Sequence, residues 1–217
     1  MSDETPLGVR MGQLARTDPR RPAVTCGAET RSREELEART NRLARAYARL
    51  GVTRDSFVTI GLPNGIEFFE AMVATWKLGA TPQPISSRLP AIERSAIIEL
   101  AQSSLVVGVD PAEAPGRAAV PAGFEPDLSL SADPLPPTIP ASFKAPTSGG
   151  STGRPKLIVA IQPGTWEALL GFATLLRVTS DGAHLVTGPL YHNGPFATSA
   201  LALLNGSHVV VMPRFDP

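Results

Sequence analysis

The sequence is poor in cysteine and lysine and has no excess of charge of either sign. Its single cysteine, Cys26, excludes an internal disulfide and fits a reducing compartment. The 20 basic and 20 acidic residues cancel, so the chain carries no overall electrostatic footprint for nucleic acid or an anionic membrane. Any binding site for an anion must therefore be built locally.

Several longer patterns are also missing. No apolar run approaches the roughly 18 residues of a membrane helix, and residues 1–10 lack the basic start and apolar core of a secretory signal. We therefore expect a cytoplasmic protein with no integral membrane segment. No Ser-His-Asp order, paired-carboxylate motif or Gly-x-Gly-x-x-Gly fingerprint is present, so hydrolase and dinucleotide-binding functions have no anchor in the sequence.

What the sequence does contain is a regular alternation of strand-like and helix-like segments. Ser32 and Glu35 have capping-box spacing before a helical pattern that ends at Gly51. The alternation predicts an α/β fold with mostly parallel sheets flanked by helices. We expect a hairpin at 23–31, helices at 32–50, 66–78, 91–101, 165–176 and 196–204, an extended stretch at 80–86, and strands at 57–60, 105–109, 183–187 and 207–212.

The expected helix at 66–78 has an apolar stripe. Phe68 and Trp76 fall on this stripe, which predicts that both are core residues. Glu67 and Glu70 flank it, and we expect them to be solvated.

Residues 110–146 are rich in proline. Proline removes a backbone donor and fixes φ, so this density excludes a helix or a central strand. We interpret the stretch as a connecting segment between two sub-regions of the chain.

Directly after this segment comes a loop of glycines and hydroxyl residues that ends in a lysine, Thr147–Lys156, with the sequence Thr-Ser-Gly-Gly-Ser-Thr-Gly-Arg-Pro-Lys. Glycines allow close approach of the backbone to a ligand, while N–H groups, hydroxyls and an ammonium favour anionic oxygens. The common nucleotide P-loop is excluded because Pro155 precedes the lysine and Leu157 follows it. A flexible linker is the alternative, but Pro155 and the flanking apolar runs argue against it.

This loop resembles the phosphate-binding signature of the adenylate-forming enzymes, written Ser/Thr-Ser-Gly-Ser/Thr-Thr-Gly-x-Pro-Lys. The family includes acyl-CoA synthetases, luciferases and peptide-synthetase adenylation domains. Gly149 departs from the signature, because serine is usual there, and this puts one phosphate contact in doubt. The segment Trp76–Pro84 is similar to a second family segment, Trp-Lys-x-Gly-Ala-x-x-x-Pro, and the expected helix and strand at 33–60 look like the family's opening elements.

The resemblance implies a role for each residue of the loop. Ser151, Thr152 and Lys156 would bind the β- and γ-phosphates of ATP, and Gly150 and Gly153 would donate backbone N–H groups. The implied phosphate site as a whole comprises Ser148, Gly149, Gly150, Ser151, Thr152, Gly153 and Lys156. Taken without the family, Lys156 would be expected in a surface ion pair.

A second segment, Pro189–Phe196, lies between an apolar strand and an apolar helix and is similar to the family's Pro-Leu/Met-Phe/Tyr-His-x-x-Gly segment. The resemblance implies that His192 is catalytic and lies beside the substrate carboxylate. It also implies an acyl pocket lined by Tyr191, His192, Asn193, Gly194 and Phe196. As an isolated residue His192 would be a packed or surface histidine, but a strand-end turn favours function. His184 and His208 lack this context, and three scattered histidines do not make a metal site.

The chain is thus expected to be the amino-terminal portion, residues 1–217, of the adenylation domain of an ATP-dependent carboxylic acid:CoA ligase. The implied co-substrates and cofactors are ATP, Mg²⁺ and coenzyme A, with a fatty or other apolar acid as substrate. The family's adenine, ribose and late-lysine segments come further along and are absent here, so we expect these residues alone not to complete the ligation.

Two other functions stay open. The chain could belong to an adenylating enzyme that loads a carrier protein, or it could be a short, non-catalytic module that binds phosphate or acyl groups. The partners expected are small molecules rather than nucleic acid, and the sequence leaves a homodimer open.

Overall fold

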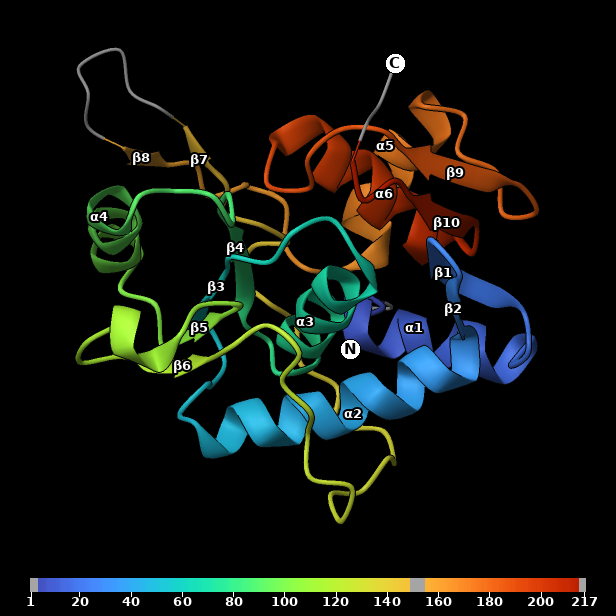
Figure 1. Cartoon of the computed structure of the whole chain (residues 1–217). Coiled ribbons are helices and arrows are strands. Elements are labelled where there is room, and N and C mark those ends of the chain that lie inside the picture. Colours follow the sequence, from blue (N-terminus) through green and yellow to red (C-terminus); the bar gives the residue numbers. More distant parts are fainter. Residues whose placement is uncertain (1–3, 149–154, 215–217) are drawn as a thin grey trace.

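The structure of the chain, a computed structural model, describes residues 4–148 and 155–214. It confirms an α/β fold in which two four-stranded sheets carry the helices (Figure 1). One sheet has the order β2-β1-β10-β9, and its strands β1, β10 and β9 are parallel. In this sheet the predicted hairpin, β1 with β2, is the antiparallel pair. The strands are β1 Pro22–Cys26, β2 Glu29–Ser32, β9 Ala183–Val186 and β10 His208–Val211.

The other sheet is entirely parallel and has the order β4-β3-β5-β6. The chain runs from β3 to β4 on one side and then returns past β3 to β5. Right-handed crossovers of opposite direction place α3 and α4 on opposite faces of this sheet. The elements are β3 Phe57–Ile60, α3 Ile66–Lys77, β4 Thr81–Pro84, α4 Ala91–Ala101, β5 Leu105–Val107 and β6 Ala118–Val120.

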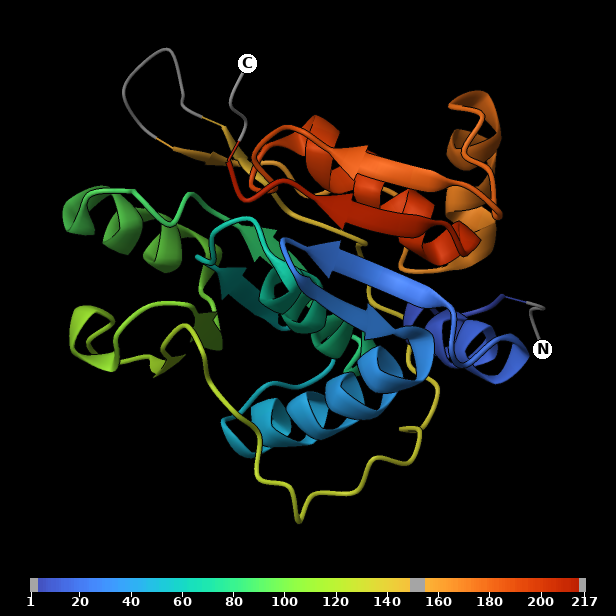
Figure 2. The ribbon, with the colours of Figure 1, turned by 45° about the vertical axis from the view of Figure 1, so that its right-hand side comes forward.

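Helix α3 lies between the two sheets, and Figure 2 shows it flanked by both. Every residue of α3 except Glu67 is buried, as expected for a helix with apolar contacts all round. Phe68 and Trp76 are fully buried, which confirms that they are core residues. The Trp76 indole N–H donates to the carbonyl of Phe143 at 2.9 Å, so its polar atom is also satisfied.

Helix α2 (Arg33–Arg49) runs along the outside of α3. The predicted capping box is present: the Glu35 amide donates to Ser32 Oγ at 3.2 Å, and the Ser32 amide donates to Glu35 Oε2 at 2.8 Å. Helix α1 (Leu7–Thr17) was not predicted from the sequence. It buries Leu7, Met11 and Leu14 at helical spacing against α2, α3 and α6.

Helix α6 (Asn193–Asn205) crosses between β9 and β10, next to α5 (Trp166–Leu175). The sequence predicted a turn up to Pro195 and a helix from Phe196, and this boundary was wrong. Pro195 lies in the first turn of α6, where backbone N–H groups make no intrahelical hydrogen bond. Its lack of an N–H therefore costs the helix nothing. Asn193 therefore belongs to the helix rather than to the turn.

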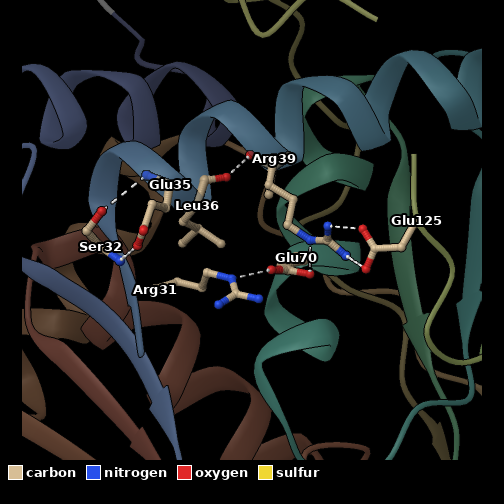
Figure 3. Close-up of polar contacts among 8 residues, drawn as sticks. Arg31, Ser32, Glu35, Leu36, Arg39, Glu70 and Glu125 are labelled. Atoms are coloured by element: carbon tan, nitrogen blue, oxygen red, sulfur yellow. Dashed lines mark hydrogen bonds and ion pairs between the residues drawn. The ribbon is translucent and has the colours of Figure 1, made fainter. Parts of the chain in front are cut away.

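The proline-rich segment contains one turn of 3₁₀ helix, Pro111–Glu113, and the edge strand β6. The rest runs across α2 without regular structure (Figure 1). Arg39 ties this segment to α3, because its guanidinium bonds to Glu125 at 2.5 and 3.0 Å and to Glu70 at 2.6 Å (Figure 3).

The prediction that Glu70 is solvated was wrong. Its side chain is only 3% exposed and also faces Arg31 at 3.5 Å. Burying an unpaired carboxylate is costly. Two arginines, Arg31 from β2 and Arg39 from α2, compensate the charge of Glu70.

Candidate functional site

The two ends of the glycine loop form a short antiparallel hairpin, β7 (Thr147–Ser148) and β8 (Lys156–Leu157). Ser148 pairs with Lys156 and Thr147 with Leu157, so the first and last predicted phosphate ligands lie side by side. The Lys156 side chain is exposed. Gly149, Gly150, Ser151, Thr152 and Gly153 lie outside the described residues.

A buried chain of polar side chains fixes the base of this hairpin to the parallel sheet. Gln83 Nε2 donates to Thr147 Oγ1 at 2.8 Å, and Gln83 Oε1 accepts from Thr59 Oγ1 at 2.7 Å. Thr59 in turn contacts Ser103 Oγ at 2.6 Å. Because Gln83 and Thr59 are fully buried, these bonds set the place of Thr147 firmly.

The second predicted segment follows the carboxyl end of β9. The turn ends at His192, which is the N-cap residue of α6 with extended backbone (φ −84°, ψ 147°). Its carbonyl accepts the amide of Phe196 at 3.1 Å, which closes the first turn. The His192 ring is exposed and lies 4.3 Å from the ring of Tyr191, measured between centroids.

The hairpin and this turn meet at one cavity of about 490 Å³. Thr147, Ser148 and Pro155 line it from the hairpin, and Tyr191 and His192 line it from the turn. The opposite wall comes from the end of β4 and from α4, and it consists of Pro84, Ile85, Ser86, Leu89, Ile92, Glu93, Ala96 and Ile97.

The structure thus brings Ser148, Tyr191 and His192 together, although they are far apart in the sequence. It does not place Asn193, Gly194 or Phe196 in the described lining of this cavity. Phe196 is fully buried and packs edge-on against Phe68, with 6.0 Å between ring centroids. Its position is that of a core residue of α6.

Asn64, which the sequence analysis did not single out, braces the turn before His192. Its Nδ2 group donates to the carbonyls of Gly188 at 3.0 Å and Met212 at 3.3 Å. Its Oδ1 accepts the amide of Leu190 at 2.9 Å. Asn64 follows β3, so this one amide joins the carboxyl ends of both sheets. No local sequence pattern could indicate this role of Asn64, because all its hydrogen-bond partners lie more than 120 residues after it in the sequence.

The three histidines differ in their surroundings. Burial lowers the pKa of His184 and, together with the nearby Arg21 charge, that of His208, and the His208 ring bonds to Thr25 Oγ1 at 2.7 Å. Neither of them lines the cavity beside His192. Both therefore lie outside this candidate site.

The cavity lies at the carboxyl ends of parallel strands, where α/β proteins bind their ligands. Its hydroxyls, imidazole and neighbouring ammonium suit an anion, and its α4 wall suits an apolar group. Within residues 4–148 and 155–214, no group of three His, Cys, Asp or Glu side chains is placed to hold a metal ion. The same part of the chain has no helix that is both long and apolar enough to cross a membrane.

Comparison with known proteins agrees with this geometry. Residues 13–217 match the protein family described as AMP-binding enzyme. The long-chain-fatty-acid–CoA ligase FadD13 of Mycobacterium tuberculosis is 27% identical, over 97% of this chain and 46% of its own length. Feruloyl-CoA synthase of an Amycolatopsis species is 32% identical, over 97% of this chain and 45% of its own.

The chain spans about half the length of the curated relatives it matches. Among solved structures, a long-chain-fatty-acid-CoA ligase (FadD1) from Archaeoglobus fulgidus superposes with a TM-score of 0.83. It is 21% identical, and the match covers all of this chain and 48% of that one, so it supports the fold. The family match over nearly the whole chain shows that this protein belongs to the AMP-binding enzyme family.

Proposed function

We propose that the protein is an ATP-dependent carboxylic acid:CoA ligase. The observation that carries this proposal is the single cavity shared by the ends of the glycine loop and the Tyr191–His192 turn. In the proposed reaction a carboxylate oxygen attacks the α-phosphorus of Mg-ATP, and pyrophosphate leaves. The thiol of CoA then attacks the acyl carbon of the adenylate, giving a thioester, AMP and a proton.

The glycine loop would hold the triphosphate in this reaction. Lys156, opposite Ser148, would lie against the β- and γ-phosphates and offset negative charge as pyrophosphate leaves. The loop residues Gly149, Gly150, Ser151, Thr152 and Gly153 would add hydroxyl and backbone donors. Mg²⁺ would enter with the nucleotide as Mg-ATP and would offset part of the phosphate charge.

His192 would lie beside the substrate carboxylate. An imidazole at this place donates a hydrogen bond to one carboxylate oxygen and leaves the other oxygen free to attack phosphorus. Tyr191, stacked on His192, would limit where the carboxylate lies. Asn193 and Gly194 follow in α6 and stay candidates for the acyl pocket, as the family resemblance implies, whereas the buried Phe196 would support the pocket only from behind.

The acid is proposed to be fatty or otherwise apolar. Ile85, Leu89 and Ile97 supply apolar surface opposite His192, and this surface fits an apolar chain or ring better than a charged one. The names of the two relatives describe acids with apolar bodies, a long-chain fatty acid and a feruloyl group.

The test uses the intact protein, meaning the full-length ligase in which residues 1–217 are expected to be the amino-terminal portion. It is incubated with Mg-ATP, CoA and a series of straight-chain and aromatic acids, and the products are identified by mass spectrometry. The expected products are AMP and acyl-CoA in equal amounts, with acyl-adenylate when CoA is omitted. Transfer to a phosphopantetheinyl carrier protein in place of CoA would indicate a carrier-loading enzyme. Ligand binding with no acyl-adenylate would overturn the proposal and favour a non-catalytic binding module.

A further inference from the structure

Lys144 is a buried cation that the proposed reaction does not use. Its side chain and that of Lys77 are equally hidden, each residue being 6% exposed. Lys77 pairs with the carboxylate of Glu37 at 2.7 Å, whereas Lys144 has no carboxylate within ion-pair distance among the described residues. Burying an ammonium without a counter-charge is costly, so its contacts require an explanation.

All hydrogen bonds that the structure gives to the Lys144 ammonium go to Asn193, the first residue of α6. Nζ donates to Asn193 Oδ1 and also faces the Asn193 carbonyl at 3.4 Å. The rings of Phe143 and Phe196 flank it, with Nζ 4.9 and 5.9 Å from their centroids. The ammonium is therefore held in one place by two aromatic faces and one amide.

The backbone of Lys144 is equally fixed. Its carbonyl accepts the amide of Ala160 at 3.0 Å, and the next residue, Ala145, donates to the carbonyl of Pro82 at 2.9 Å. Lys144 thus lies on the extended stretch that leads into Thr147, the base of the glycine-loop hairpin. Because this backbone is fixed, the Lys144 side chain can hold Asn193 in a defined position.

The place it holds is an unusual one for a cation. The amino end of a helix carries partial positive charge, so an ammonium beside α6 gains nothing from the helix dipole. What it does fix is the residue that directly follows His192. Asn64 fixes the other end of the same turn, through Gly188 and Leu190.

We propose that Lys144 is a positioning residue that sets the His192 turn against the glycine-loop hairpin, by holding Asn193 at the start of α6. This inference rests on the proposed function for its kinetic consequence, but its structural part is independent of any activity. Asn64 and Lys144 together hold both ends of the segment 188–193 from outside it.

The kinetic test compares Lys144→Met with Lys77→Met in the intact protein. Lys144→Met keeps an apolar stem of similar length but removes the donors, so kcat for adenylate formation should fall by about tenfold or more. KM for ATP should stay near the wild-type value, because the loop itself is unchanged. Lys77→Met removes an equally buried lysine on α3 and should leave kcat near wild type; equal losses in both variants would overturn the inference.

A second readout needs no enzymatic activity. Single substitutions of His184, His192 and His208 assign their ring signals in ¹H–¹³C spectra of the protein. In Lys144→Met the His192 ring signals should move while those of His184 and His208 stay in place. Unchanged His192 signals would overturn the inference. If the wild-type protein shows no ligase activity but the His192 signals still move in Lys144→Met, the inference is supported and the proposed function is refuted.

A third readout is made on the wild-type protein. Selective lysine labelling is used, and the signal that is missing from the Lys144→Met spectrum identifies Lys144. A nuclear Overhauser contact between the Lys144 ε-methylene and the Asn193 side-chain amide is expected. Its absence would contradict the proposed link between these residues.

Discussion

At the scale of single residues, the protonation of Lys144 makes stability depend on pH. Burial lowers the pKa of Lys144 from 10.5 to about 8. Below pH 8 the ammonium is charged in both the folded and the unfolded chain, and its burial penalty is constant. Between pH 8 and 10.5 the unfolded chain binds the proton more strongly, so this group makes the free energy of unfolding rise with pH.

Lys144→Met removes this dependence. We predict that wild type gains about 2 kcal/mol relative to the variant when the pH is raised from 7.5 to 10. Urea unfolding of both proteins at several pH values measures it. A difference between the two proteins that stays constant with pH would show that Lys144 is not buried as a charge.

Single residues also show how far the sequence could predict the site. Tyr191 and His192 were predictable because their segment resembles a family motif and, for His192, because it lies at a strand-end turn; both line the cavity. Lys144 and Asn64 were not, because each acts on residues between 49 and 148 positions away. The burial of Glu70 was equally unpredictable, since the arginines that neutralise it belong to β2 and α2 rather than to its own helix.

At the scale of elements, the contact between Arg39 on α2 and Glu70 on α3 should be important for stability. Arg39→Met leaves the buried Glu70 carboxylate with only Arg31 nearby, and should lower the free energy of unfolding by about 3 kcal/mol.

The matched control is Glu125→Gln, which breaks the exposed half of the same network. Glu125 is 69% exposed, so its loss should cost less than about 1 kcal/mol. Urea unfolding at neutral pH compares the two variants, and similar costs for both would contradict the account of Glu70.

Elements with local signals were predicted best. Helix α2 was predicted closely because its capping box and apolar spacing agree. Helix α6 starts earlier than predicted because Pro195 was taken to exclude a helix, whereas the first helical turn accepts proline. Strand β6 was missed because it lies in the proline-rich stretch 110–146, which was interpreted as a connecting segment.

At the scale of the whole molecule, the α/β class was predictable but the division into two sheets was not. Alternating segments indicate crossover units, yet periodicity says nothing of which distant strands pair. The pairing of β1 with β10 joins the two ends of the chain, and α3 fills the space between the sheets. This arrangement brings the carboxyl ends of both sheets to Asn64 and thereby to the cavity.

In the proposed reaction, an acyl-adenylate forms from ATP and a carboxylic acid in this cavity. The most direct test is acid-dependent exchange of labelled pyrophosphate into ATP by the intact protein, with Mg²⁺ present and CoA absent. We predict exchange that requires the acid and falls by about a hundredfold in Lys156→Ala, because a charge that stabilises the leaving pyrophosphate is lost. ATP binding without exchange for any acid of the series, or full exchange in Lys156→Ala, would contradict the account.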